Sequence, residues 1–193
     1  MKKYILRFLI CIVLFNGLPI DLLAQKLPDS IRLRVVLIRH GEKPPKGFNL
    51  SCRGFNRSLE LPKVITSLFG IPDFIYVPTL KSGNTINSVR MYQTVVPLAV
   101  KYNLNVNTIH DQLDTAGVVD DIKKKSGTIL LVWDLRNILP IVRNFGIDTK
   151  NLKWHESDFD SVWIIDFLKS NGEILIPKLS MTKENINPSP RCQ

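Results

Sequence analysis

The sequence is poor in the residues from which protein metal sites are built. Among its 193 residues there are only three histidines and three cysteines. The histidines His40, His110 and His155 stand far apart in the chain, whereas a metal site draws several ligands from short, defined spacings. We therefore expect no bound metal ion, and His155 is interpreted as a surface side chain.

The sequence also lacks an apolar run long enough to span a membrane, which takes roughly 20 residues. A shorter apolar run at residues 8–15 follows the basic segment 2–7 and precedes the small residue Ala24. This pattern is typical of a secretory signal peptide. We expect residues 1–24 to be that signal and the mature protein to be periplasmic or secreted. Leu22, where a second small residue is preferred, leaves open an uncleaved signal that tethers the protein.

Acidic residues are outnumbered by basic ones, 17 against 26, which gives a formal net charge of +9. This balance suits an anionic ligand, but it also simply keeps a protein soluble, and we expect no nucleic-acid partner from it. The composition, 45% hydrophobic and 22% charged, is that of an ordinary folded chain. The length predicts one domain, at residues 25–181, followed by a loosely ordered tail at residues 182–193.

Two cysteines remain after the signal peptide, Cys52 and Cys192. An oxidising compartment permits them to pair, and the sequence alone leaves the pairing open. Arg53 and Arg57 shortly after Cys52 raise the alternative of a cysteine-dependent phosphatase. That chemistry places an arginine six positions after the cysteine, where this chain has Ser58, so the alternative is disfavoured.

Hydrophobic patterning alternates between strands and helices along the chain. The expected strands are residues 31–38, 74–77, 105–109 and 128–133, and the expected helices are residues 53–69, 88–102, 118–125 and 137–145. Residues 162–167 and 173–179 are predicted to form a closing hairpin. Alternation of this kind predicts a three-layer α/β/α sandwich with a mainly parallel sheet.

Arg39 and His40 come directly after the first predicted strand. In an open parallel sheet, ligands bind at the carboxyl ends of the strands. A neutral imidazole can act as a nucleophile toward phosphorus, and nearby positive charge favours the neutral form. Arginine offers paired donors that match phosphate oxygens. The two residues therefore predict a phosphate-binding loop with His40 as the candidate nucleophile.

Residues 36–43, VLIRHGEK, resemble the opening motif of the histidine phosphatase superfamily, the phosphoglycerate-mutase-like group. Residues 88–94, SVRMYQT, are similar to that family's second motif, a helix start whose arginine joins the phosphate pocket. The stretch 53–57 resembles the start of the family's first helix, and residues 154–163 resemble the late part of a small bacterial branch. The resemblance spans nearly all of the mature chain and implies a phosphoglycerate-mutase-like fold.

The resemblance implies that His40 accepts a phosphoryl group as phosphohistidine and that water later releases phosphate. Arg39 and Arg90 are then expected to bind the phosphoryl oxygens. An acid in the loop after the third strand, Asp111 or Asp114, is expected to protonate the leaving oxygen. The residues expected to help bind the substrate are Lys43, Arg53, Ser88 and His110.

One member of the family's pattern is missing, because the family completes its pocket with a second histidine and the expected position here holds Leu135. Loss of one such donor typically slows a reaction roughly a hundredfold to a thousandfold. Arg136 and His110 are candidates to supply the missing charge.

Two functions therefore stay open. The first is an exported phosphohydrolase that acts through His40 on a small phosphorylated compound, without a metal or organic cofactor. The second is a catalytically impaired protein that binds a phosphorylated or anionic ligand. The sequence indicates no oligomeric state.

Overall fold

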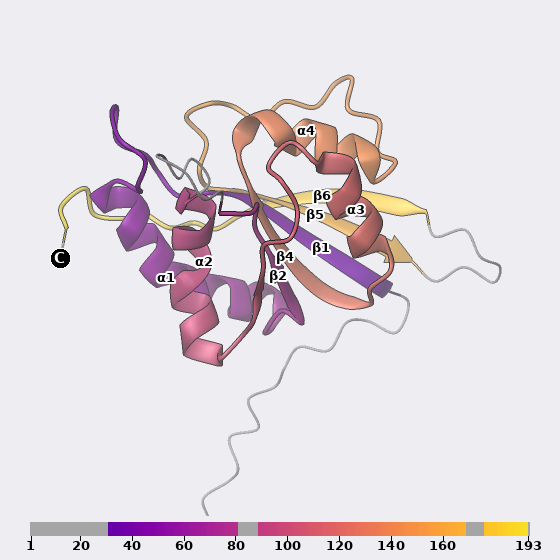
Figure 1. The fold of residues 1–193 in the computed structure, drawn as a ribbon, viewed down its shortest axis with the longest axis horizontal. Helices are drawn as coiled ribbons and strands as arrows, with labels where there is room; N and C mark the ends of the chain where they lie inside the picture. The colour runs from indigo at the N-terminus through magenta and orange to yellow at the C-terminus, as the bar shows by residue number, and fades with distance from the viewer. Residues whose placement is uncertain (1–30, 81–88, 169–175, 193) are drawn as a thin grey trace, which may run out of the picture.

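The protein consists of a sheet between two layers of helices (Figure 1). The computed structural model describes residues 31–80, 89–168 and 176–192. Helices α1 (Cys52–Phe69) and α2 (Val89–Tyr102) pack on one face of the sheet, and α3 (Thr115–Lys123) and α4 (Leu135–Asn144) pack on the other. This arrangement confirms the predicted three-layer α/β/α sandwich. The expected signal peptide lies outside the described residues.

The described strands form one six-stranded sheet in the order β3-β2-β4-β1-β5-β6. The parallel strands are β3 (Val106–Asn107), β2 (Phe74–Tyr76), β4 (Gly127–Trp133) and β1 (Ile31–Arg39). β5 (Ser161–Leu168) and β6 (Pro177–Lys183) are antiparallel and extend the sheet beyond β1. Because Arg39 pairs in register with Trp133, the carboxyl ends of β1 and β4 reach the same edge of the sheet.

The two central strands are buried on both faces, as their continuous apolar sequences predict. Val35 and Leu37 of β1 contact the layer of α3 and α4, whereas the alternate residues Val36 and Ile38 contact the layer of α1 and α2. All four side chains are completely buried. Full burial of such a side chain stabilises the fold by about 1.5–3 kcal/mol, so β1 forms a rigid support for the residues that follow it.

Several elements begin at residues other than those that the patterning predicted, among them α3, which begins at Thr115 and not at residue 118. α4 begins at Leu135, two residues early, because the Asp134 side chain caps the helix by accepting a hydrogen bond from the Arg136 N–H. Such a cap satisfies a donor that the first helical turn leaves unpaired. The last strand begins at Pro177, later than predicted. α2 begins at Val89, and its predicted cap, Ser88, lies outside the described residues. No helix in the described ranges has the length and apolarity to cross a membrane.

The expectation of a loosely ordered tail from residue 182 is wrong for the described part of that segment. β6 continues to Lys183, and Glu184 and Ile186 are buried. The Asn56 side-chain amide in α1 donates hydrogen bonds to the carbonyl oxygens of Ser189 and Arg191. A disulfide joins Cys52 to Cys192. The prolines near the C-terminus interrupt any strand or helix pattern, so the sequence predicted a loose tail. Contacts with α1 nevertheless hold this segment in place.

We expect loss of the disulfide to destabilise the protein, because the bond links positions 140 residues apart and so restricts the unfolded chain. The double variant Cys52→Ser/Cys192→Ser should lose about 2–4 kcal/mol of unfolding free energy in urea denaturation. A reductant should lower the stability of the wild type to that of the variant and leave the variant unchanged, since residues 25–193 contain no other cysteine. If the wild type and the double variant had equal stability without reductant, the expected contribution of the disulfide to stability would be contradicted.

Candidate active site

A cavity of about 530 Å³ lies at the edge of the sheet where β1 and β4 end. The side chains around it come from the end of β1 and the loop that follows it, from the residues after β4 that lead into α4, from the loop after β3, from the start of α2 and from the segment before β5. They are Arg39, His40, Lys43, Arg90, Gln112, Asp134, Leu135, Arg136, Glu156 and Phe159. The predicted strand-end position of the site is thus where a cavity is found.

Positive charge predominates in the cavity lining. Two cations in this lining, Arg39 and Arg90, lie close enough to His40 to lower its pKa. Lys43 and Arg136 add two more, against the two carboxylates of Asp134 and Glu156. Convergent cations in a concave site favour an anionic ligand, because its negative charge offsets their mutual repulsion.

His40 is 5% exposed and is held by the backbone next to it. Its Nδ1 lies 2.7 Å from the carbonyl oxygen of Gly41. Because a carbonyl oxygen only accepts hydrogen bonds, Nδ1 carries the proton in the neutral ring and Nε2 carries the lone pair. Burial, opposed by the Gly41 carbonyl and assisted by Arg39 and Arg90, lowers the pKa of His40 to about 4. The imidazole is therefore neutral near pH 7, as a nitrogen nucleophile requires.

The Arg39 side chain is packed between backbone carbonyls and an aromatic ring. Its Nη1 donates to the carbonyl oxygens of Glu156 at 2.6 Å and Asp158 at 3.3 Å, and its guanidinium lies 4.0 Å from the centre of the Phe159 ring. Burial lowers the pKa of Arg39. Its buried Nε makes no hydrogen bond within the described part of the chain. A buried donor without a partner is unfavourable.

Arg90 stands in the first turn of α2 and also lines the cavity. Its Nε donates to the carbonyl oxygen of Asn49 at 3.2 Å, and its Nη2 donates to that of Gly47. These contacts fix the loop between β1 and α1 beside the cavity. A cation at the positive end of a helix is unfavourable on its own, which favours a role in anion binding for this arginine.

Four of the predicted site residues meet around the cavity: Arg39, His40, Lys43 and Arg90. Other predicted residues lie away from it. Arg53 is exposed on α1. His110 lies instead beside two acids, with Nδ1 3.1 Å from Asp114 Oδ2 and Nε2 3.8 Å from Asp121 Oδ2.

Asp111 does not line the cavity either, and its Oδ1 accepts a hydrogen bond from the Leu113 N–H at 3.0 Å. A loop position near the site does not say which way a side chain points, so sequence reasoning selected the wrong neighbours. Gln112, the residue after Asp111, is the one that reaches the cavity.

Leu135 lines the cavity at the position where the family resemblance expects a histidine. Asp134 beside it was missed by the sequence analysis, although it directly follows β4 and the strand-end rule applies to it. Its carboxylate accepts hydrogen bonds from Gln112 Nε2 at 2.9 Å and Asn137 Nδ2 at 2.6 Å. Glu156 and Phe159 were also missed as cavity residues, because their segment carries no strand or helix pattern.

The His40 imidazole should titrate near pH 4 in the folded protein, against about 6.5 in an unfolded chain. NMR titration of the ring, with the signal identified through its loss in His40→Ala, measures this value. Because the unfolded chain takes up the proton first, this group should make unfolding easier as pH falls from about 6.5 to about 4. Arg90→Gln should raise the midpoint of the His40 titration, because it removes a positive charge that lowers the pKa of His40. A wild-type midpoint near 6.5 would show that the ring is solvated.

No family model matches the chain, and no curated protein does. Solved structures do. The protein histidine phosphatase SixA complexed with tungstate is 14% identical, with a TM-score of 0.51 over 81% of this chain and 97% of that one. A protein assigned as the phosphohistidine phosphatase SixA of Agrobacterium tumefaciens is 15% identical, with a TM-score of 0.51 over 79% and 99% of the chains.

A phosphoserine phosphatase of Entamoeba histolytica, in complex with 3-phosphoglyceric acid, is 16% identical, with a TM-score of 0.50 over 72% of this chain and 95% of that one. Identities this low establish shared architecture, and the parallel core with its strand-end cavity agrees with it. The chain therefore has the fold of the histidine phosphatase superfamily, the phosphoglycerate-mutase-like group.

Proposed function

We propose that this protein is a phosphatase in which His40 is the nucleophile. The observation that carries the proposal is a buried, neutral imidazole at a cavity that also contains Arg39 and Arg90. Its Nδ1 is tied to the Gly41 carbonyl, so the lone pair is on Nε2. Solved structures with the same fold include phosphatases, which supports the same class of reaction here.

In the proposed first step, His40 Nε2 forms a bond to phosphorus while the bond from phosphorus to the substrate's leaving oxygen breaks. Arg39 and Arg90 bind the phosphoryl oxygens and stabilise the charge that spreads over them. The leaving oxygen takes a proton from a cavity carboxyl, for which Glu156 and Asp134 replace the predicted Asp111. Water then attacks phosphorus while the bond from phosphorus to His40 Nε2 breaks, and the carboxylate that gave up its proton in the first step takes one from the water, which releases phosphate and restores the neutral imidazole.

Leu135 makes the proposed site weaker than one with a second histidine. A leucine offers no donor to the phosphoryl group, so part of the charge stabilisation has to come from the cavity's arginines. Arg136 is the nearest cation in sequence and lines the same cavity. We therefore expect slow but measurable turnover of a small phosphorylated compound.

Hydrolysis of an aryl phosphate by the mature chain tests the assignment. His40→Ala should abolish turnover, because the group that accepts the phosphoryl is gone. Leu135→His should raise kcat by roughly a hundredfold to a thousandfold, because it restores one transition-state donor. Leu139→Ala, which alters another apolar side chain of α4 packed against the core, is the matched control and should not raise kcat. Turnover that survives His40→Ala would exclude His40 as the nucleophile.

The second function, a protein that binds a phosphorylated or anionic ligand without turnover, is favoured by Leu135 alone. Calorimetry with inorganic phosphate separates the two. Binding by the wild type that is lost in Arg90→Gln, together with absent hydrolysis, would identify a binding protein. Hydrolysis by the wild type rules this function out.

We also propose that the protein is exported, as its first 24 residues predict. The Cys52–Cys192 disulfide supports this, because such bonds persist mainly in oxidising compartments. Expression of the full chain in a bacterial host, followed by mass spectrometry of the periplasmic and secreted fractions, should give a chain that begins at Gln25. Recovery of the intact chain in the membrane fraction would instead indicate a tether.

A further inference from the structure

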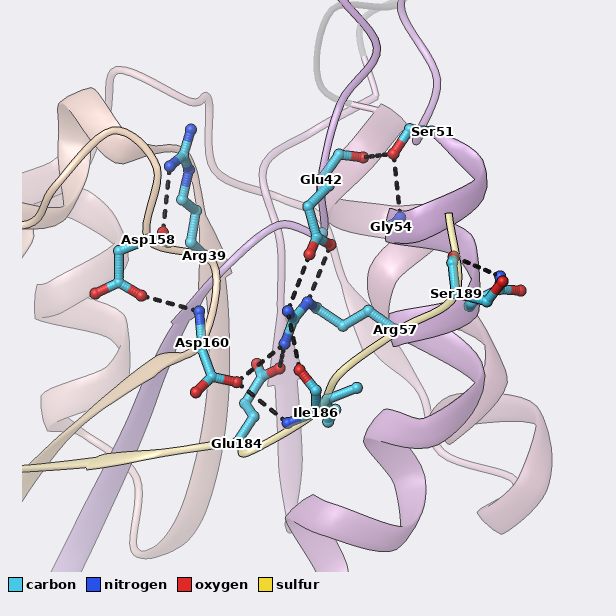
Figure 2. Close-up of polar contacts among 12 residues, drawn as sticks. Arg39, Glu42, Ser51, Gly54, Arg57, Asp158, Asp160, Glu184, Ile186 and Ser189 are labelled. Atoms are coloured by element: carbon cyan, nitrogen blue, oxygen red, sulfur yellow. Dashed lines mark hydrogen bonds and ion pairs between the residues drawn. The ribbon is translucent and has the colours of Figure 1, made fainter. Parts of the chain in front are cut away.

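Arg57 lies in a buried cluster of carboxylates that is separate from the cavity. From α1 it makes two parallel bonds to Glu42, with Nε 3.0 Å from Oε2 and Nη2 2.9 Å from Oε1. Its Nη1 lies 2.6 Å from Glu184 Oε2 and 3.3 Å from Asp160 Oδ1. Figure 2 shows the guanidinium between these three acids, each of which comes from a different segment. Arg57 therefore joins four parts of the chain at one point.

Because this cluster is largely buried, removal of one partner is expected to cost more than the loss of a surface ion pair, since the remaining charge would stay buried and unpaired. The Arg57 side chain is 5% exposed and that of Glu184 is 1% exposed. Burial alone would lower the pKa of Arg57, but Glu42 and Glu184 more than reverse this and raise it. Burial raises the pKa of Glu184 to about 8, although Arg57 opposes the shift. Among the three acids, Glu42 is the one that makes two parallel bonds to the Arg57 guanidinium.

Glu42 belongs to the segment that sets the state of His40. Its backbone carbonyl accepts hydrogen bonds from the Ser51 N–H at 2.8 Å and the Ser51 hydroxyl at 3.1 Å. The preceding residue, Gly41, donates its N–H to Thr94 Oγ1 at 2.9 Å and presents its carbonyl oxygen to His40 Nδ1. A rotation of this segment would move the acceptor that keeps the proton on Nδ1.

Asp160 connects the same guanidinium to the segment that holds Arg39. Its N–H donates to Asp158 Oδ1 at 2.9 Å, and the Asp158 carbonyl oxygen accepts from Arg39 Nη1. In Figure 2 Arg57 stands between the Glu42 segment and the Asp158–Asp160 segment. Arg57 thus supports both the segment next to His40 and the segment that holds Arg39.

We propose, building on the function proposed above, that Arg57 is a positioning residue for phosphoryl transfer. Through Glu42 it holds the Gly41 carbonyl that keeps His40 in the Nδ1–H tautomer, and through Asp160 it supports the loop that orients Arg39. It does not touch the substrate, since it lies outside the cavity lining. Its contribution is to keep the nucleophile's lone pair on Nε2.

A second arginine provides the matched control. Arg34 on β1 also makes two parallel bonds to a carboxylate, with Nε 2.7 Å from Asp166 Oδ1 and Nη2 2.8 Å from Asp166 Oδ2. This pair joins β1 to β5 and does not line the cavity. A purely structural arginine is expected to affect stability without affecting the tautomer of His40.

The test compares Arg57→Lys with Arg34→Lys in the mature, oxidised chain. Lysine keeps the charge but loses the two parallel bonds. Arg57→Lys should lower kcat on an aryl phosphate by about tenfold to a hundredfold, the loss expected from slight misplacement of a reacting group. Nitrogen NMR of the His40 ring should show the Nε2–H tautomer in Arg57→Lys and only Nδ1–H in the wild type. Arg34→Lys should change neither measurement.

The tautomer is measured without substrate, so it tests Arg57 even if the wild type shows no turnover and the proposed phosphatase function fails. If circular dichroism shows that Arg57→Lys does not fold, Glu42→Gln breaks the same contact and should give the same two changes. An unchanged tautomer and kcat in the folded variant would overturn the proposal. Equal changes in Arg34→Lys would overturn it as well.

Discussion

The site depends on the direct contact between the loop after β1 and the start of α1. A Cβ atom at Gly54 would lie 2.2 Å from the Glu42 carbonyl oxygen, and one at Gly41 would lie 2.9 Å from the Gly54 carbonyl oxygen. Any side chain at Gly54 would force the two backbones apart. This close approach lets Ser51 reach the Glu42 carbonyl and lets Arg57 reach the Glu42 carboxylate. The backbone that presents His40 is consequently held from both sides.

Burial and charge act together on the two residues that define the cavity. His40 and Arg39 are each 5% exposed, and loss of solvent disfavours the charged state of both. For His40 this produces a neutral nucleophile. Arg39 stays charged, because an arginine does not give up its proton in a protein, and its desolvated guanidinium interacts more strongly with an anion than it would in water. The same buried environment thus gives a neutral imidazole at His40 and a strongly anion-binding guanidinium at Arg39.

Much of the architecture was predictable because it depends on local patterns. The strands around residues 31–38 and 128–133 were recognised from their apolar runs, and the structure places them side by side in a parallel sheet. The ends of elements were less predictable. Asp134 caps α4 and so starts that helix at Leu135, and β6 runs on to Lys183, past the residue at which the loose tail was predicted to begin. Caps and packing partners decide such boundaries, and they lie outside the local pattern.

The sequence by itself determined the fold class and the pairing of Arg39 with His40 at a strand end, because periodicity and neighbouring residues are local properties. Only the tertiary structure decided which distant side chains share the cavity. It brings Glu156 and Phe159 to Arg39 and turns His110 toward Asp114. It also joins Glu42, Asp160 and Glu184 around Arg57. These contacts depend on the directions of side chains and on how the layers pack. No short segment of the sequence carries that information.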